Sequence, residues 1–282
     1  MGRRTVRRRV TRLVDGVPDD RADTLVSEEP MEIRLAGRPL TITMRTPGDD
    51  FDLAAGFLVG EGVVAGPADI VSIVYCAGAA DEGGNTYNIV DVRLADGVRM
   101  PDATLERNFY TTSACGLCGK ASLDAVRTVA RWPVADDPLR LDPAEVIALP
   151  DRLRAAQRVF DRTGGLHAAG LFDAAGELLC LREDVGRHNA VDKIVGWAVR
   201  RGALPLRGTT LMVSGRASFE LAQKAVMAGI PAMAAVSAPS SLAVELAAES
   251  GLTLIGFLRG HSMNVYTGGH RLTTVASAAA PA

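Results

Sequence analysis

Two cysteines, Cys115 and Cys118, form the one Cys-x-x-C pair in the sequence. Thiols at this spacing can form a reversible disulfide, supply half of a zinc site, or pass a sulfane sulfur as a persulfide. All three reactions need thiolates, which nearby positive charge and open backbone N–H groups favour. Gly116 and Gly119 leave such N–H groups open, and Lys120 adds a positive charge. The spacing by itself does not choose among the three chemistries.

Zinc binding and thioredoxin-like chemistry both lack their usual sequence context. A structural zinc site normally needs two further Cys or His ligands, but Cys76 and Cys180 lie in apolar runs and are expected to be buried strand residues. A thioredoxin-like pair should open a helix directly after an early strand, whereas Cys115 and Cys118 lie in a mid-chain segment without apolar periodicity. We therefore expect no bound metal, and persulfide chemistry remains the better fit.

Three polar clusters follow apolar strands in the second half, at 214–218, 237–241 and 259–262. The carboxyl ends of parallel strands lie along one edge of a sheet, where ligands bind. The first two clusters also open helices, whose free N–H groups suit phosphate, although plain helix capping is the alternative. The pattern predicts nucleotide or phosphate binding. Neither G-x-G-x-x-G nor a P-loop is present, so ordinary dinucleotide or ATP use is not expected.

Two histidines lie near these clusters. His167, at the start of an expected strand, could act as a ligand or a base, or could be a hydrogen-bonded structural residue. His188 lies between Arg187 and Asn189 in the run 183–189, which also opens a helix after a strand. The residues beside His188 favour a functional role for it.

The first half of the chain is expected to mix strands and helices without a repeat. Apolar and polar residues alternate on either side of Gly37-Arg38-Pro39, which predicts a β-hairpin. Asp49-Asp50 offers an N-cap for a helix that runs through Leu58 and ends near Gly60. The further expected elements are strands at 70–76 and 87–94, a loop at 78–86 and a helix at 121–131.

The second half alternates strands and helices more regularly. The expected strands are 168–172, 178–181, 210–213, 232–236 and 252–258, and the expected helices are 143–160, 190–198, 217–228 and 241–250. Because parallel strands are joined by right-handed crossovers, we expect a mixed sheet with helices on both faces. Residues 133–143 carry several Pro and Asp residues, which favours a linker between the two halves.

Composition excludes several classes of protein. The 282 residues are 48% hydrophobic and 23% charged, which is typical of a globular protein. A net charge of -2 and few aromatic residues give no reason to expect nucleic-acid binding. No stretch of 18 apolar residues occurs, so no membrane association is expected.

The first twelve residues contain six arginines and no apolar region follows them, so we do not expect a signal peptide. This indicates a cytoplasmic protein. The arginines could bind an acidic partner or nucleic acid. The alternative is a solvated, partly disordered arm or a first edge strand.

Several blocks of the sequence resemble the formate dehydrogenase accessory sulfurtransferases, the FdhD family. The resemblance covers residues 27 to 272, and the Glu-Asp-Val-Gly-Arg-His block at 183–188 is its most specific part. The matching blocks are 28–33, 44–50, 56–58, 115–120, 163–169, 183–193, 214–218, 237–241 and 256–266.

The resemblance implies a function. Members of this family carry sulfur from a cysteine desulfurase to the molybdenum bis(molybdopterin guanine dinucleotide) cofactor, which is required for formate dehydrogenase activity. It implies that Cys115 holds the persulfide, with Cys118 as its catalytic partner, and that GDP binds as a fragment of the cofactor. The residues that it places at the cofactor site, together with the strand-end cluster, are Ser214, Arg216, His261, Ser262, Met263, Asn264, Val265 and Tyr266. A homodimer is a further possibility.

The expected class is α/β, with an α+β N-terminal part. We expect a basic arm or edge strand at 1–26, a mixed α+β domain with the Cys-x-x-C loop at 27–132, and an α/β domain at 140–275. By resemblance, this last domain is a three-layer α/β/α sandwich similar to the cytidine deaminases.

Two rival functions remain. A zinc deaminase needs H-x-E and P-C-x-x-C, but Ala168 and Ala169 follow His167, and Ala114 precedes Cys115. A non-catalytic chaperone that binds the cofactor and docks it on formate dehydrogenase is the stronger rival. Substituting the cysteine pair would separate a sulfur carrier from such a chaperone.

Overall fold

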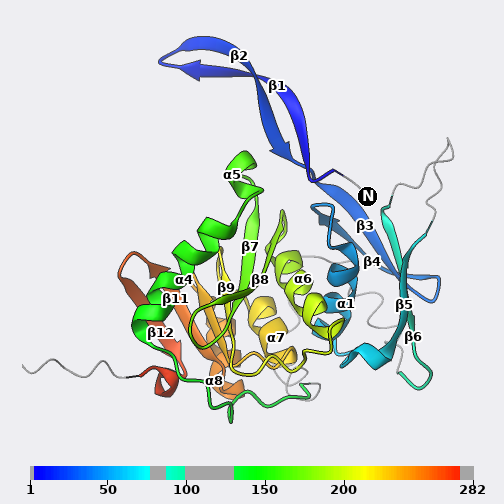
Figure 1. Ribbon diagram of the computed structural model, residues 1–282, viewed down its shortest axis with the longest axis vertical. Helices are drawn as coiled ribbons and strands as arrows, with labels where there is room; N and C mark the ends of the chain where they lie inside the picture. The colour runs from blue at the N-terminus through cyan, green and yellow to red at the C-terminus, as the bar shows by residue number, and fades with distance from the viewer. Residues whose placement is uncertain (1–2, 77–86, 99–129, 274–282) are drawn as a thin grey trace, which may run out of the picture.

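The computed structural model describes residues 3–76, 87–98 and 130–273, which form a mixed α/β protein with three sheets (Figure 1). The predicted loop at 78–86, most of the predicted helix at 121–131 and the Cys-x-x-C segment lie outside the described residues. No described helix is long and apolar enough to span a membrane.

The N-terminal segment is a two-stranded antiparallel hairpin, formed by β1 (Thr5–Val14) and β2 (Val17–Val26). Its turn consists of Asp15 and Gly16, which both have positive φ angles. Asp-Gly between two strand-forming runs is a strong signal for a two-residue hairpin turn. The prediction of an arm or one edge strand is therefore incomplete, because this segment forms two paired strands.

The next segments form a four-stranded sheet in the order β4-β3-β6-β5. Its strands are β3 (Glu29–Leu35), β4 (Arg38–Arg45), β5 (Ile70–Tyr75) and β6 (Ile89–Leu94). The predicted hairpin is confirmed, with Ala36 and Gly37 in its turn. Met31, Ile33 and Leu35 alternate into the core. After β4 come helix α1 (Asp50–Gly60), as predicted, and the short helix η1 (Pro67–Asp69).

The second half builds a six-stranded mixed sheet in the order β12-β11-β10-β9-β7-β8. Strands β9, β10 and β11 are parallel, and β7, β8 and β12 run antiparallel to their neighbours, so the predicted mixed sheet is confirmed. The strands are β7 (His167–Phe172), β8 (Leu178–Asp184), β9 (Thr210–Val213), β10 (Ala232–Ala235), β11 (Thr253–Arg259) and β12 (Ser262–Thr267).

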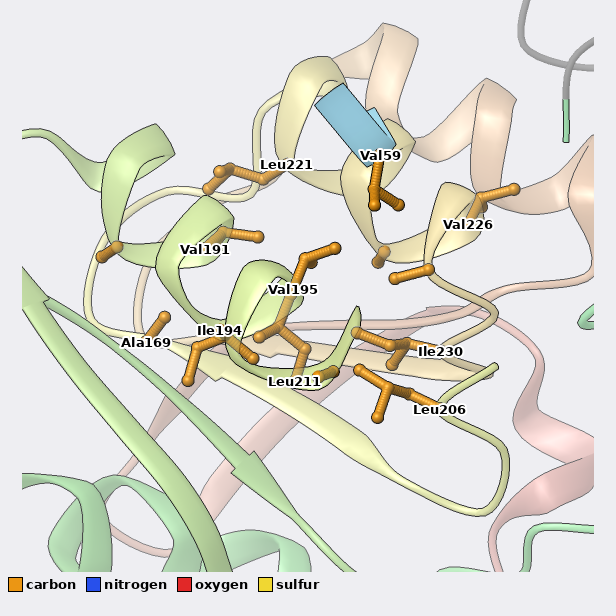
Figure 2. Close-up of a cluster of buried hydrophobic side chains, with 14 of the residues drawn as sticks. Val59, Ala169, Val191, Ile194, Val195, Leu206, Leu211, Leu221, Val226 and Ile230 are labelled. Carbon is orange, nitrogen blue, oxygen red and sulfur yellow. The ribbon is translucent and has the colours of Figure 1, made fainter. Parts of the chain in front are cut away.

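Helices cover both faces of this sheet, which gives the expected three layers. The helices are α4 (Pro143–Ala156), α5 (Phe160–Thr163), α6 (Arg187–Val199), α7 (Phe219–Met227), α8 (Ser241–Ser250) and the short η2 (Gly269–Arg271). Because strand side chains alternate between faces, Met212 packs on the α4 side and Leu211 on the side of α6. Figure 2 shows Ile194 and Val195 of α6 against Leu211. The likeness to cytidine deaminases stays a prediction.

Helices α1 and α6 join the two halves of the chain into one hydrophobic core. They cross so closely that a methyl group on Gly56 would overlap the carbonyl of Asp192, and one on Gly196 would overlap the carbonyl of Asp52. Leu53 of α1 and Ile194 of α6 belong to the same buried cluster. Glycine is required at both positions because backbone fills the space that a side chain would take.

The run predicted as a linker, 133–143, is irregular as far as the start of α4, but it is packed against the sheet. Its residues Val134, Leu139 and Leu141 are buried. The buried guanidinium of Arg271 donates hydrogen bonds to the carbonyls of Val134 and Ala135. This run is therefore part of the folded body.

We predict that Gly196→Ala lowers the free energy of unfolding by about 3 kcal/mol, the upper end of the usual range for an overpacked core. The added methyl group can be accommodated only if α1 and α6 move apart. Gly66→Ala is the matched control, because an added methyl there meets no atom within 4 Å. Urea denaturation of both variants measures the difference, and equal midpoints would contradict the close crossing.

Candidate functional site

The polar clusters found in the sequence gather at one edge of the six-stranded sheet. Strands β8, β9 and β10 end there, β7 begins there, and α6, α7 and α8 start there. Clusters 214–218 and 237–241 touch: the Ala217 amide donates to the Ala238 carbonyl over 3.2 Å, and the Ser240 amide to the Ala217 carbonyl over 3.0 Å. We call residues 183–189, 214–218, 237–241 and His167 the polar edge.

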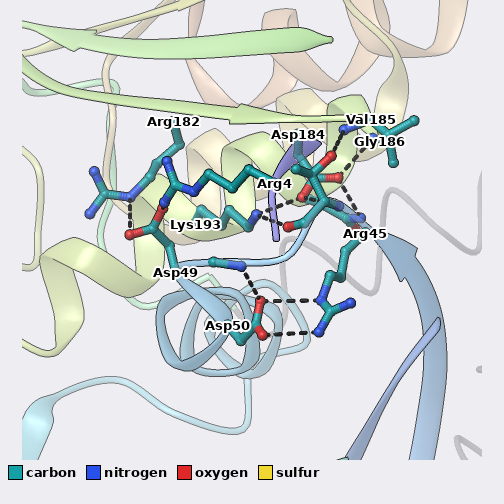
Figure 3. Close-up of polar contacts among 12 residues, drawn as sticks. Arg4, Arg45, Asp49, Asp50, Arg182, Asp184, Val185, Gly186 and Lys193 are labelled. Atoms are coloured by element: carbon teal, nitrogen blue, oxygen red, sulfur yellow. Dashed lines mark hydrogen bonds and ion pairs between the residues drawn. The ribbon is translucent and has the colours of Figure 1, made fainter. Parts of the chain in front are cut away.

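A buried carboxylate, that of Asp184, organises the start of α6. It accepts hydrogen bonds from the Thr46 amide at 3.1 Å, the Gly186 amide at 2.8 Å and the Asn189 side chain at 3.0 Å. The Lys193 ammonium lies 2.6 Å from the same carboxylate and also donates to the Thr46 carbonyl (Figure 3). Asp184 and Lys193 are both fully buried. These contacts fix the β8–α6 turn against the β4–α1 loop.

A second buried ion pair lies at the start of α1. The guanidinium of Arg45, which is fully buried, binds both carboxylate oxygens of Asp50 at 3.1 and 3.2 Å. The Tyr75 hydroxyl donates to the same carboxylate over 3.1 Å. Burial and the neighbouring Asp50 carboxylate raise the pKa of Tyr75. This cluster holds β4, α1 and β5 together and is a structural part of the molecule.

The base of the β1–β2 hairpin is attached to this network. Arg4 pairs with Asp49, the residue before α1, at 2.6 Å, and Arg182 of β8 approaches the same carboxylate at 3.8 Å (Figure 3). The Ser27 amide donates to the Arg4 carbonyl over 2.9 Å. Thus the hairpin is anchored beside the polar edge.

Arg187, the first residue of α6, differs from these paired arginines. Its Nε is buried without a hydrogen-bond partner, and its guanidinium makes no hydrogen bond or ion pair with any described residue. A Cβ added to Gly215 would lie 4.0 Å from Cδ of Arg187 and 3.5 Å from the His167 imidazole. Glycine at position 215 therefore keeps open a space between Arg187 and His167. An unsatisfied buried donor beside such a space indicates a missing acceptor.

His167 lies half-buried on the other side of Gly215. Burial lowers the pKa of His167, and the nearby charges of Arg187 and His188 lower it further. Within the described part of the chain its ring makes no hydrogen bond, so the alternative of a hydrogen-bonded structural histidine finds no partner there. The lowered pKa favours the neutral imidazole of His167.

His188 is held by α7. Its Nε2 lies 3.4 Å from the Ser218 hydroxyl oxygen and 3.7 Å from the Glu220 carboxylate. The nearby imidazole of His188 lowers the pKa of Glu220 to about 2, although partial burial acts in the opposite direction. His188 thus ties α6 to α7.

A pocket of about 600 Å³ lies beside the polar edge, between α4, α5 and the start of β7. Its polar wall includes His167 and Ser214, and its apolar wall includes Leu153, Phe160 and Val236. The Ser214 hydroxyl accepts a hydrogen bond from the Ala168 amide over 2.9 Å, which fixes its position. The pocket lining also includes the polar residues Asp151, Arg154 and Gln157.

The structure separates the predicted cofactor residues. Ser214 lines the pocket, whereas Arg216 is exposed. On β12, Met263 packs on the α4 side, while the ring of Tyr266 lies over Gly256 beside Pro239. In the strand register Asn264 stands opposite Gly256, so it shares the face of Tyr266. Val265 stands opposite Ile255, which packs on the α4 side with Met263. The exposed β11–β12 turn carries His261 and Ser262.

The four cysteines differ in where they lie. Cys115 and Cys118 lie outside the described residues. As predicted, Cys180 is buried, and this burial raises its thiol pKa to about 11. The prediction that Cys76 is a buried strand residue is wrong, because Cys76 is half-buried and directly follows the end of β5. Across the described ranges, no group of three His, Cys, Asp or Glu residues could hold a metal ion.

Comparison with known proteins places these features in a family. Residues 26–273 match the model of the FdhD/NarQ family, beginning at the last residue of β2. A sulfur carrier protein FdhD from Streptomyces avermitilis is 71% identical over 280 residues, 99% of each chain. One from Mycolicibacterium paratuberculosis is 61% identical over 268 residues, 95% of this chain and 98% of the relative.

A solved structure shares the fold. It is a Desulfotalea psychrophila protein assigned as a formate dehydrogenase accessory protein. It matches with a TM-score of 0.74 and 24% identity over 95% of this chain and 99% of its own. The arrangement of sheets and helices is therefore common to both proteins.

We predict that Asp184→Asn lowers the free energy of unfolding by about 3–5 kcal/mol, because it leaves the buried Lys193 ammonium without its counter-charge. Asp161→Asn is the matched control. Asp161 pairs with Arg154 at the surface, where loss of a pair costs about 1 kcal/mol or less. Chemical denaturation measures both, and a small loss for Asp184→Asn would show that this carboxylate does not organise the turn.

Proposed function

Because the chain belongs to the FdhD/NarQ family, we propose that it carries sulfane sulfur from a cysteine desulfurase to the molybdenum bis(molybdopterin guanine dinucleotide) cofactor of a formate dehydrogenase. Relatives that cover nearly the whole chain are named sulfur carrier proteins. The structural observation that supports cofactor binding is the buried, unsatisfied Nε of Arg187 beside the open space at Gly215.

The sulfur step needs one accessible thiolate. The Cys115 thiolate attacks the outer sulfur of the desulfurase persulfide; a new S–S bond forms on Cys115, and the desulfurase thiolate leaves. The sulfane sulfur keeps its oxidation state in this exchange. Cys118 is close enough in sequence to relay the sulfur or to resolve the persulfide. In the second case its thiolate attacks Cys115, hydrosulfide leaves, and a disulfide remains.

The residues of the polar edge fit a polyanion. The proposed cofactor carries guanine nucleotides and several phosphates. The N-cap of α6 is Gly186, which has no side chain to cap the helix, so backbone N–H groups at the start of α6 remain available. Arg187 supplies a guanidinium that is unpaired among the described residues, and a guanidinium can bind phosphate with two parallel hydrogen bonds. We place a phosphate between Arg187, Gly215 and His167.

Other predicted residues surround this position. Arg216 reaches the phosphates from the exposed rim, and Ser214 connects them to the pocket. Asn264 and Tyr266 lie on the face of the sheet that carries the 237–241 loop, where they can contact a purine ring. GDP, as a fragment of the cofactor, should therefore bind at the polar edge. The protein is further proposed to be cytoplasmic and to form a homodimer.

A cofactor-binding chaperone without sulfur chemistry remains the second candidate. It would use the same polar edge, which the Arg187 geometry supports equally. The two functions differ in their need for Cys115 and Cys118, so the cysteine variants distinguish them.

We predict that Cys115 carries the persulfide. After incubation with a cysteine desulfurase and cysteine, intact-mass and peptide mass spectrometry should find one extra sulfur on Cys115. Cys115→Ala should abolish this loading, while Cys76→Ala, a control at a half-buried thiol, should retain it. Loading that persists in Cys115→Ala through Cys118 would remove Cys115 from the principal role. Normal formate dehydrogenase maturation by a variant lacking both thiols would favour the chaperone.

We predict that Arg187→Ala and Arg216→Ala each weaken GDP binding, by about 1.5–3 kcal/mol for a lost hydrogen bond to a charged group. Arg187 should contribute the larger share, because its guanidinium is partly buried while Arg216 is exposed. Titration calorimetry on folded variants measures this, with the exposed Arg38→Ala as the control. Unchanged affinity in both variants would place the nucleotide elsewhere.

A further inference from the structure

The β1–β2 hairpin extends from the body without cover. From Arg7 to Ala22, every residue except Val10 is exposed, and the two strands pair only with each other among the described strands (Figure 1). Its base is fixed by the Arg4–Asp49 pair and by β2, which lies against α5. A Cβ on Gly165, in the wall of the pocket, would lie 3.3 Å from the Val26 side chain. The hairpin therefore starts at the polar edge and ends free in solvent.

The tip of the hairpin is apolar. Leu13, Val14 and Val17, on either side of the Asp15-Gly16 turn, are 67%, 47% and 66% exposed. Exposed strand edges are commonly protected by charged residues, and a lone two-stranded hairpin is marginally stable in water. Neither consideration explains three large apolar side chains at the tip. They would gain free energy by entering an apolar pocket of another molecule.

The stem of the hairpin carries unpaired positive charge. Arg7, Arg8, Arg9 and Arg12 have no carboxylate within 4.0 Å among the residues that the structure describes. This holds although Asp19 stands opposite Arg12 in the strand register. These guanidinium groups are thus free to meet carboxylates on a partner.

We propose that the β1–β2 hairpin is a docking arm for a protein with an apolar pocket inside an acidic rim, and that this protein is apo-formate dehydrogenase. An apolar centre within a charged rim is the usual composition of a protein–protein interface. The choice of partner rests on the proposed function: a recipient of the cofactor must approach the polar edge, where the hairpin is anchored. The family model begins at residue 26, whereas the Streptomyces avermitilis relative aligns over 99% of this chain and so includes the arm.

Nucleic acid is the other anionic occupant of a basic two-stranded ribbon. The apolar tip of the ribbon has no counterpart on a phosphate backbone, whereas it can enter an apolar pocket of a protein. The tip therefore favours a protein as the partner.

The first experiment alters the tip. Leu13→Ser/Val14→Ser/Val17→Ser in the full chain should weaken binding to purified apo-formate dehydrogenase by at least about tenfold, the scale of a lost interface hot spot. Sulfur loading by the desulfurase and GDP affinity should stay unchanged, which also shows that the body is folded. Val71→Ser/Val74→Ser, which alters similarly exposed side chains on β5, is the matched control and should bind the dehydrogenase normally.

The second experiment removes the charges. Arg7→Gln/Arg8→Gln/Arg9→Gln/Arg12→Gln should also weaken binding at least about tenfold, and the salt dependence of binding should become shallower than in the unaltered chain, because screened charge pairs are lost. The tip variant should keep the original salt dependence. The salt dependence therefore distinguishes the contribution of the arginines from that of the apolar tip.

The docking arm would be contradicted if both variants bound the dehydrogenase as tightly as the unaltered chain, or if the unaltered chain did not bind it. It would also be contradicted if the variants lost binding only to the desulfurase, or lost binding to duplex DNA but not to the dehydrogenase. Each of these outcomes leaves sulfur loading and GDP binding intact. Failure of sulfur loading and GDP binding in the unaltered chain would instead contradict the proposed function.

Discussion

The buried carboxylate of Asp184 is the constraint on which the functional end of the molecule depends. A charge that is removed from water must be paired and hydrogen-bonded, or the folded state loses several kcal/mol. Asp184 meets this requirement with donors from the β4–α1 loop, from its own turn and from α6. Because all of these donors must reach the Asp184 carboxylate together, they fix where α6 begins and where its first side chains lie.

Close backbone packing carries this arrangement through the rest of the protein. Because Gly56 and Gly196 bring α1 and α6 into direct contact, the four-stranded sheet and the six-stranded sheet are held in one body. Further ion pairs follow the same helices, including Lys224 of α7 with Asp192 of α6 at 2.7 Å. Arg187 differs from these residues because its guanidinium makes no ion pair among the residues that the structure describes.

The same end of the molecule thus combines two kinds of surface. The polar edge carries the start of α6, the arginine Arg187 and the histidine His167, with the pocket beside them. The hairpin extends from this edge and presents arginines and an apolar tip to a larger partner. A cofactor held at the polar edge would therefore lie next to the protein that the arm engages.

The sequence by itself determined the elements with clear local patterns. Periods of two residues predicted β3 and β4, and periods of 3.6 residues predicted α6, because these repeats follow from backbone geometry alone. The Cys pair and the family were recognisable from short blocks, and Asp15-Gly16 was a local turn signal that could have revealed the hairpin.

Tertiary structure decided which charged side chains are paired and which are not. Arg187 and Arg216 look alike in sequence, but the first is partly buried and the second exposed. Thr46 and Asp184 meet across 138 residues. Partners that distant depend on packing, because no local pattern encodes which charge remains unpaired.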